Sequence, residues 1–203
     1  MRLTLALRHM NKFTTLFSSI LLGLVFSGCS KSGEISAIEE AIRLELKKPE
    51  GKLTPEHYQG LKELSIYRVG RPVKDISLLG ELTNLETLEF AGGEISDPTP
   101  LAKLTKLHQL QIHECGLKDF SALTDMTSLE ELMASGNKVS DISSLKGLTN
   151  LKVLNLKDNL IKDVSPLLEL KSLTWVDLSG NSVSEQAIED LKKALPKCKI
   201  EHD

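Results

Sequence analysis

Leucine recurs at one strict interval through most of this chain, and that repeat limits the possible folds more than any other feature. Successive leucines lie 22 residues apart at Leu85, Leu107, Leu129, Leu151, Leu173 and Leu195. The intervals share the frame L-x-x-L-x-L-x-x-N-x-I-x-D, with substitutions at several places. A period of about 20–50 residues indicates stacked units, because one unit cannot bury its apolar face without a neighbour. The sequence therefore predicts a solenoid with one continuous core.

The L-x-L part of the frame alternates apolar residues with others, which is the pattern of a short strand that buries one face. The inward residues stand at the fourth and sixth places, as in Leu154 and Leu156. An earlier strand is expected at residues 61–66. A last one is expected at residues 197–200, with Cys198 and Ile200 at the fourth and sixth places. The sheet should thus contain about seven strands.

Polar residues at two further places have structural explanations. The ninth place holds Gly93, Cys115, Asn137, Asn159 and Asn181. An asparagine there can turn inward and bind backbone groups of adjacent coils, which would otherwise be left unpaired at a cost of about 1–3 kcal/mol. Asp at the thirteenth place, followed by Ser or Thr two residues later, caps a tight 3₁₀-like turn. A calcium column is the alternative for these acids, but their capping role leads us to expect no metal.

These repeats resemble the 22-residue class of bacterial leucine-rich repeat proteins, which includes the internalins and related cell-surface proteins. The resemblance covers residues 34–203 and implies an α/β fold. The implied structure is a right-handed solenoid with a parallel concave sheet, helical caps, and short 3₁₀ turns on the convex side. We expect an N-terminal helical cap at residues 34–60, repeats at 61–183, and a C-terminal cap helix and strand at 184–203. Cys115 and Cys198 would lie about four coils apart, at ~4.8 Å per strand, too far for a disulfide.

The start of the chain differs from the remainder in charge. Residues 1–28 contain three basic residues and no acidic one, whereas residues 29–203 contain 22 basic and 28 acidic residues. The apolar run at residues 16–26 suits the h-region of a signal peptide, because a membrane span needs about 20 residues. We therefore predict a signal peptide at residues 1–28, with Met10 as the expected start.

The sequence Phe26-Ser27-Gly28-Cys29 resembles a bacterial lipobox, apart from Phe26, where leucine is usual. The resemblance implies cleavage before Cys29, lipidation of Cys29, and a short lipidated tether at residues 29–33. A free cysteine beside an ordinary cleavage site is the alternative. The expected location is the cell envelope, as a membrane-anchored lipoprotein. In a cell with two membranes it would be at the outer membrane, on the periplasmic side or the surface.

The third, fifth and seventh places of each strand should face solvent, because they alternate with the core positions. Met133, Val153 and Trp175 form a diagonal apolar streak among them, of the kind that anchors interfaces. Isolated apolar surface residues are the alternative. The predicted partner-binding residues are Tyr67, His113, Met133, Val153, Lys157, Trp175 and Asp177. The area suits one protein partner of a monomer, because about 20–30 residues form one side of a standard interface.

Other classes of function lack support in the sequence. The balance of 25 basic and 28 acidic residues offers no basic patch for nucleic acid. No phosphate loop or paired-carboxylate site is evident, and spacing places no Ser or Cys nucleophile beside His113. We therefore expect no catalytic residue and no cofactor, and predict a lipid-anchored binding module of the cell envelope. The alternatives are an accessory subunit of an envelope enzyme complex and an internalin-like surface adhesin.

Overall fold

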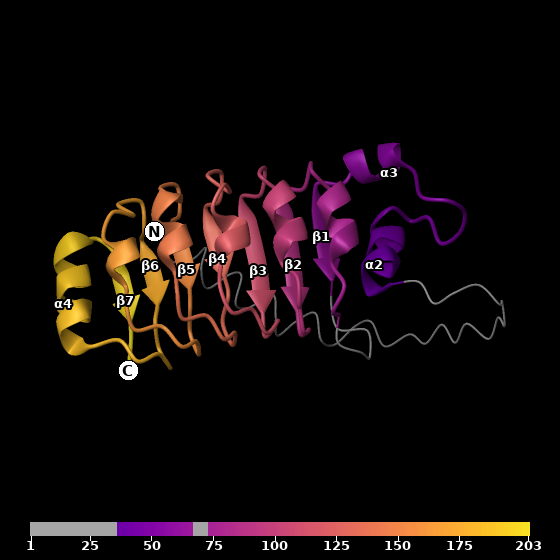
Figure 1. Cartoon of the computed structure of the whole chain (residues 1–203). Helices are drawn as coiled ribbons and strands as arrows, with labels where there is room; N and C mark the ends of the chain where they lie inside the picture. Colours follow the sequence, from indigo (N-terminus) through magenta and orange to yellow (C-terminus); the bar gives the residue numbers. More distant parts are fainter. Residues whose placement is uncertain (1–35, 67–72) are drawn as a thin grey trace, which may run out of the picture. The chain divides into compact units, whose positions relative to one another are not determined.

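Seven short strands form one parallel sheet, in which each strand pairs with its neighbours along the chain (Figure 1). The computed structural model describes residues 36–66 and 73–203. Tyr67, Cys29 and the predicted signal peptide lie outside these residues. The strands are β1 (Glu63–Ile66), β2 (Thr87–Ala91), β3 (Gln109–His113), β4 (Glu131–Met133), β5 (Val153–Asn155), β6 (Trp175–Asp177) and β7 (Lys199–Glu201).

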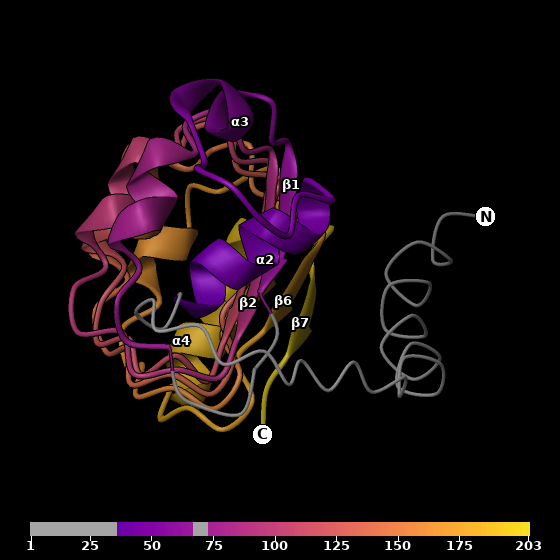
Figure 2. The same ribbon diagram turned by 90° about the vertical axis from the view of Figure 1, so that its right-hand side faces the viewer.

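The chain returns between strands through tight 3₁₀ turns. They are η2 (Ser77–Glu81), η3 (Thr99–Lys103), η4 (Ser121–Leu123), η5 (Ser143–Gly147) and η6 (Ser165–Leu167). Figure 2 looks along the stack and shows the sheet on one side and these turns on the opposite side. The predicted fold class is confirmed: the structure is an open leucine-rich solenoid whose concave wall is the parallel sheet.

The repeated apolar residues line up inside the stack. Leu88, Leu110, Leu132 and Leu154 occupy equivalent places in adjacent strands, and each is fully buried. Core side chains from successive coils form one cluster that continues from the first cap to the last. Each coil therefore buries its leucines against two neighbours, which explains why the repeat must be regular.

Each expected Asp cap forms in the structure. The carboxylate of the Asp accepts the N–H of the Ser or Thr two residues later at 2.8–2.9 Å, as in the bond from Ser143 to Asp141. Hydrogen bonds from the backbone and hydroxyl of that residue lower the pKa of every one of these Asp residues. The column at the thirteenth place thus starts the 3₁₀ turns, as predicted.

The ninth-place ladder is also confirmed. Asn137 Oδ1 accepts the N–H of Cys115 at 3.0 Å and that of Leu117 at 3.1 Å, while its Nδ2 donates to the carbonyl of Ile112 at 2.8 Å. Cys115 fills the equivalent place one coil earlier, and its thiol donates to the His113 carbonyl at 3.1 Å. Burial raises the pKa of Cys115 to about 12, so the thiol is protonated and structural.

In the part of the chain that the structure describes, the helices α2 and α3 precede the first strand. Helix α2 (Ala37–Glu45) begins after Ser36, whose hydroxyl accepts the N–H of Glu39 at 3.1 Å, and it buries Ile38 and Ile42 beside β1. Helix α3 (Pro55–Gln59) follows Thr54 with Pro55 at its first position, as the sequence predicted. Within the described residues, every helix is too short or too polar to span a membrane.

The C-terminal end corrects one prediction. Helix α4 (Glu185–Ala194) begins after Ser184 and buries Ile188 and Leu191. The 22-residue interval placed Cys198 opposite Val176, but the structure pairs Val176 with Ile200 and leaves Cys198 half-buried before β7. An α-helix replaces the short 3₁₀ turn in this coil, so the chain uses two more residues before it rejoins the sheet. Cys115 and Cys198 are both free thiols.

Candidate protein-interaction surface

The residues that alternate with the core positions form a continuous outer surface of the sheet, which we call the sheet face. Backbone pairing fixes their spacing from strand to strand, so their arrangement is rigid. The corrected register places Lys199 beside Trp175 and Glu201 beside Asp177. The described members are Glu63, Ser65, Thr87, Glu89, Ala91, Gln109, Gln111, His113, Glu131, Met133, Ser135, Val153, Asn155, Lys157, Trp175, Asp177, Ser179, Lys199 and Glu201.

Met133, Val153 and Trp175 lie together on the sheet face, and we call them the apolar cluster. Val153 on β5 pairs in register with Trp175 on β6. Met133 on β4 lies diagonally across from Val153. All three are half-buried, whereas the sequence predicted full exposure. Side chains of adjacent strands cover one another on this face, which leaves a shallow apolar surface in place of isolated projecting residues.

Glu201 ties the indole of Trp175 to the last strand. The indole N–H donates to Glu201 Oε1 at 3.1 Å, and Lys199 Nζ donates to the same oxygen at 2.5 Å. These hydrogen bonds, that from Lys199 above all, lower the pKa of Glu201. Sequence reasoning missed this contact because the uniform 22-residue interval put Glu201 beside Ser179, two residues beyond its true partner Asp177.

His113 lies next to Ser135, which corrects the expectation that no serine stands beside it. The ring Nδ1 is 2.7 Å from the hydroxyl of Ser135, which occupies the same place one coil later. Burial lowers the pKa of His113. A hydrolase would also require oxyanion donors and a substrate cleft at this pair. The contact joins the same place of two adjacent coils, so it stabilises their stacking.

Two other predicted partner residues differ in accessibility. Lys157 is exposed, as expected. Asp177 is only 7% exposed, whereas the sequence predicted that its side chain would be accessible to a partner. Its Oδ1 accepts the N–H of Ser179 at 2.9 Å, and Asn155 and Glu201 flank it in register. A residue on an inner strand of the sheet has a neighbouring strand on each side, and their side chains cover an outward side chain that also bends toward its own backbone.

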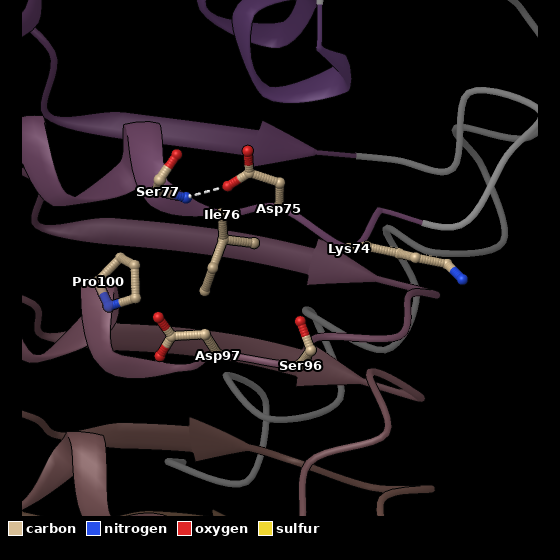
Figure 3. A pocket seen from close by; sticks show the side chains of 7 residues that line it. All are labelled: Lys74, Asp75, Ile76, Ser77, Ser96, Asp97 and Pro100. Carbon is tan, nitrogen blue, oxygen red and sulfur yellow. Dashed lines mark hydrogen bonds between the residues drawn. The ribbon is translucent and has the colours of Figure 1, made fainter.

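The cavity lies between the first two coils, at the start of their 3₁₀ turns (Figure 3). Its volume is about 200 Å³, below the 300–1,000 Å³ that is usual for small-molecule sites. Figure 3 shows that the carboxylate of Asp75, in its wall, already accepts the N–H of Ser77. No group of three or more potential metal ligands comes together within residues 36–66 and 73–203. The sheet face is therefore the better candidate for function.

Comparison with known proteins identifies the repeated unit. Residues 127–169 match the family model described as leucine rich repeats in two copies. The coils over these residues match leucine-rich repeats. No curated protein matches this chain. Solenoids of this kind present extended concave binding surfaces, which agrees with the position of the sheet face.

Solved structures of bacterial leucine-rich repeat proteins share the fold. An internalin from Listeria monocytogenes is 27% identical, with a TM-score of 0.64; the match covers 81% of this chain and 54% of that one. Internalin C2 from the same organism is 23% identical, with a TM-score of 0.65 and 81% of each chain covered. A leucine-rich repeat protein of Leptospira interrogans is 25% identical, with a TM-score of 0.65, over 71% of this chain and 38% of that one. The chain thus spans about half the length of the first internalin.

Proposed function

We propose that the protein is a lipid-anchored binding module of the cell envelope and that its sheet face binds one protein partner. The apolar cluster is the observation that carries this proposal. Met133, Val153 and Trp175 meet on a rigid parallel sheet, where the core cannot bury them. Tryptophan is enriched among the few residues that supply most of the binding free energy at interfaces. The sheet face is also similar in size to one side of a standard interface, roughly 20–30 residues.

The envelope location rests on the N-terminal sequence. The apolar run at residues 16–26 ends three residues before Cys29, and residues 27–28 are small, as a lipoprotein signal requires. Each buried methylene of an acyl chain contributes about 0.8 kcal/mol, and stable anchoring takes more than one chain. A cysteine that carries two or three acyl chains meets that requirement and would hold the solenoid at a membrane surface.

The Trp175→Ala and Met133→Ala double variant tests the binding site. Truncation of an interface anchor costs about 2 kcal/mol or more, which weakens binding roughly 30-fold. We therefore expect the immobilised double variant to lose a partner that the wild-type protein captures from the detergent-solubilised envelope. Far-UV circular dichroism should match the wild-type spectrum, because neither side chain belongs to the core cluster.

A matched control removes two apolar side chains from elsewhere. Leu44 and Leu160 are 72% and 58% exposed, and neither lies on the sheet face. The Leu44→Ala and Leu160→Ala double variant should capture the partner as well as the wild type does. Equal capture by the wild type and the Trp175→Ala, Met133→Ala variant would reject the proposed site.

The lipid anchor is tested separately with Cys29→Ala. This variant keeps the apolar run but lacks the thiol that would be acylated, so we expect the protein to move from the membrane fraction to the soluble fraction. The measurement is an immunoblot of the two fractions after ultracentrifugation, with Cys198→Ala as the control. A Cys29→Ala protein that stays in the membrane fraction would count against lipidation.

A further inference from the structure

The indole of Trp175 is held by the neighbouring strand. Its N–H donates to Glu201 Oε1 at 3.1 Å, and Glu201 pairs in register with Asp177, two residues beyond Trp175. The bond therefore runs diagonally from β6 to β7, over a distance that an aromatic side chain can span. A tryptophan side chain has two rotatable side-chain bonds, so one hydrogen bond to the ring restricts both and sets its orientation on the sheet face.

Glu201 is itself fixed at both ends. Its backbone carbonyl accepts the N–H of Leu178 at 2.8 Å, which holds the residue in the sheet. Lys199 forms an ion pair with its carboxylate and donates to the same oxygen as the indole. Because hydrogen bonds from Lys199 and Trp175 lower its pKa, Glu201 is ionised at neutral pH. Hydrogen bonds to a charged acceptor are stronger than those between neutral groups, so the indole has a firm anchor.

We propose that Glu201 is a positioning residue of the binding site, which holds the Trp175 indole in the orientation that the partner contacts. Glu201 acts through Trp175 and needs no contact of its own with the partner. Its carboxylate is already engaged within the chain, by Lys199 and by the indole, which agrees with this role. The inference rests on the proposed function, because it concerns the same surface.

The physical reason is the conformational entropy of the side chain. An indole that rotates freely must be immobilised when a partner binds, and ordering one such side chain weakens binding about two- to tenfold. Glu201 removes this cost because it orders the ring before the partner arrives. Met133 and Val153 carry no hydrogen-bond donor, so Trp175 is the member of the apolar cluster that a polar contact can fix. The last coil thereby contributes to an apolar binding site through a charged residue.

The mobility of the ring can be measured directly. Trp175 is the only tryptophan of the 203-residue chain, so the fluorescence anisotropy of tryptophan reports how freely this ring moves. In the full-length protein, Glu201→Ala should lower the anisotropy, because the indole loses its acceptor. Glu201→Gln should restore most of it, because the amide oxygen still accepts an N–H. The matched control is Glu189→Ala, which removes an exposed carboxylate paired with Lys192 on α4, outside the sheet face.

Partner capture tests whether this orientation matters for binding. The measurement is the amount of detergent-solubilised envelope that gives half-maximal capture by the immobilised protein. Glu201→Ala should weaken capture about two- to tenfold, and Glu201→Gln should stay close to the wild type. Trp175→Phe keeps an aromatic ring but has no N–H, so in this background Glu201→Ala should cause no further loss. A residue that only stabilised the fold would weaken capture equally in both backgrounds.

Unchanged anisotropy in Glu201→Ala, or an equal loss of capture in the Trp175→Phe background, would overturn the positioning role. Normal capture by Glu201→Ala would overturn it as well, if the Trp175→Ala, Met133→Ala variant loses the partner. Normal capture by that double variant rejects the proposed function itself, whatever the anisotropy shows. The two failures are therefore distinguishable.

Discussion

Two buried asparagines, Asn137 and Asn159, and the half-buried Asn181 connect the coils at the ends of the strands. Asn159 shows what each one does: Oδ1 accepts the N–H of Val139 at 3.1 Å, and Nδ2 donates to the carbonyls of Ala134 at 3.0 Å and Leu156 at 2.9 Å. One side chain thus binds backbone groups of two adjacent coils at the point where the strands end and their ladder bonds stop. The ladder therefore stabilises the stacking as well as the turn.

Asn159→Ala should be strongly destabilising. The change leaves the buried N–H of Val139 without a partner, at a cost of about 1–3 kcal/mol, whereas the carbonyls of Ala134 and Leu156 keep bonds from Asn137 Nδ2 and Asn181 Nδ2. We expect the free energy of unfolding to fall by about 1–3 kcal/mol, measured by urea unfolding. The matched control is Asn150→Ala, because the exposed Asn150 makes one bond, to the Thr127 carbonyl at 2.8 Å. Equal losses for the two variants would contradict the role of the ladder.

At the scale of the element, the Asp caps make the 3₁₀ turns sensitive to acid. Each of the five capping carboxylates accepts hydrogen bonds from the following Ser or Thr, and these bonds lower its pKa below the ordinary value of 3.8. A lowered pKa in the folded state means that folding favours the ionised form. The resulting stabilisation is complete above about pH 3.8 and is lost as the pH falls through the folded-state pKa.

We therefore expect the urea midpoint of unfolding to fall between about pH 5 and about pH 2. Replacing the five Asp residues with Asn tests the cause, because the amide oxygen still accepts the N–H bond but the side chain does not titrate. The fivefold variant should show a smaller decrease over the same pH range. An unchanged decrease would show that other carboxylates control the acid response.

On the scale of the whole molecule, the core is continuous from α2 to α4, and its two ends are covered by helices. Without α4, the last coil would expose core leucines to water, as the terminal repeats of a solenoid do when they lack a cap. Leu191 is fully buried in α4 and belongs to the same cluster as the central leucines. The stability of the C-terminal coils should therefore depend on this helix.

Leu191→Ala tests the cap. Truncation of a buried leucine typically costs about 2–5 kcal/mol, so the unfolding midpoint in urea should fall clearly. Trp175 fluorescence follows the C-terminal coils and far-UV circular dichroism follows the whole chain. The two transitions should shift together, because one core connects all coils. Leu160→Ala, at a 58% exposed residue, should change stability by less than about 0.5 kcal/mol. Separate transitions in the Leu191→Ala variant would show that the C-terminal coils unfold independently.

The sequence by itself determined the solenoid, the strands of the regular 22-residue coils, the ladder and the Asp caps. Each of these depends on residues at fixed local spacing, and the strict period repeats the same local structure in every regular coil. It also placed Met133, Val153 and Trp175 on one face, because alternation along a strand and registry between coils both follow from the period.

Only the tertiary structure decided how these residues meet their neighbours. The register of β7 depends on the path of α4, which a constant interval cannot describe, and it brings Glu201 to Trp175. The burial of Asp177 results from side chains on both adjacent strands. The glycine at the ninth place of the second coil is explained in the same way, because a Cβ on Gly93 would lie 2.7 Å from the Val73 carbonyl oxygen. Contacts across coils depend on three-dimensional distances, which the period of a sequence does not contain.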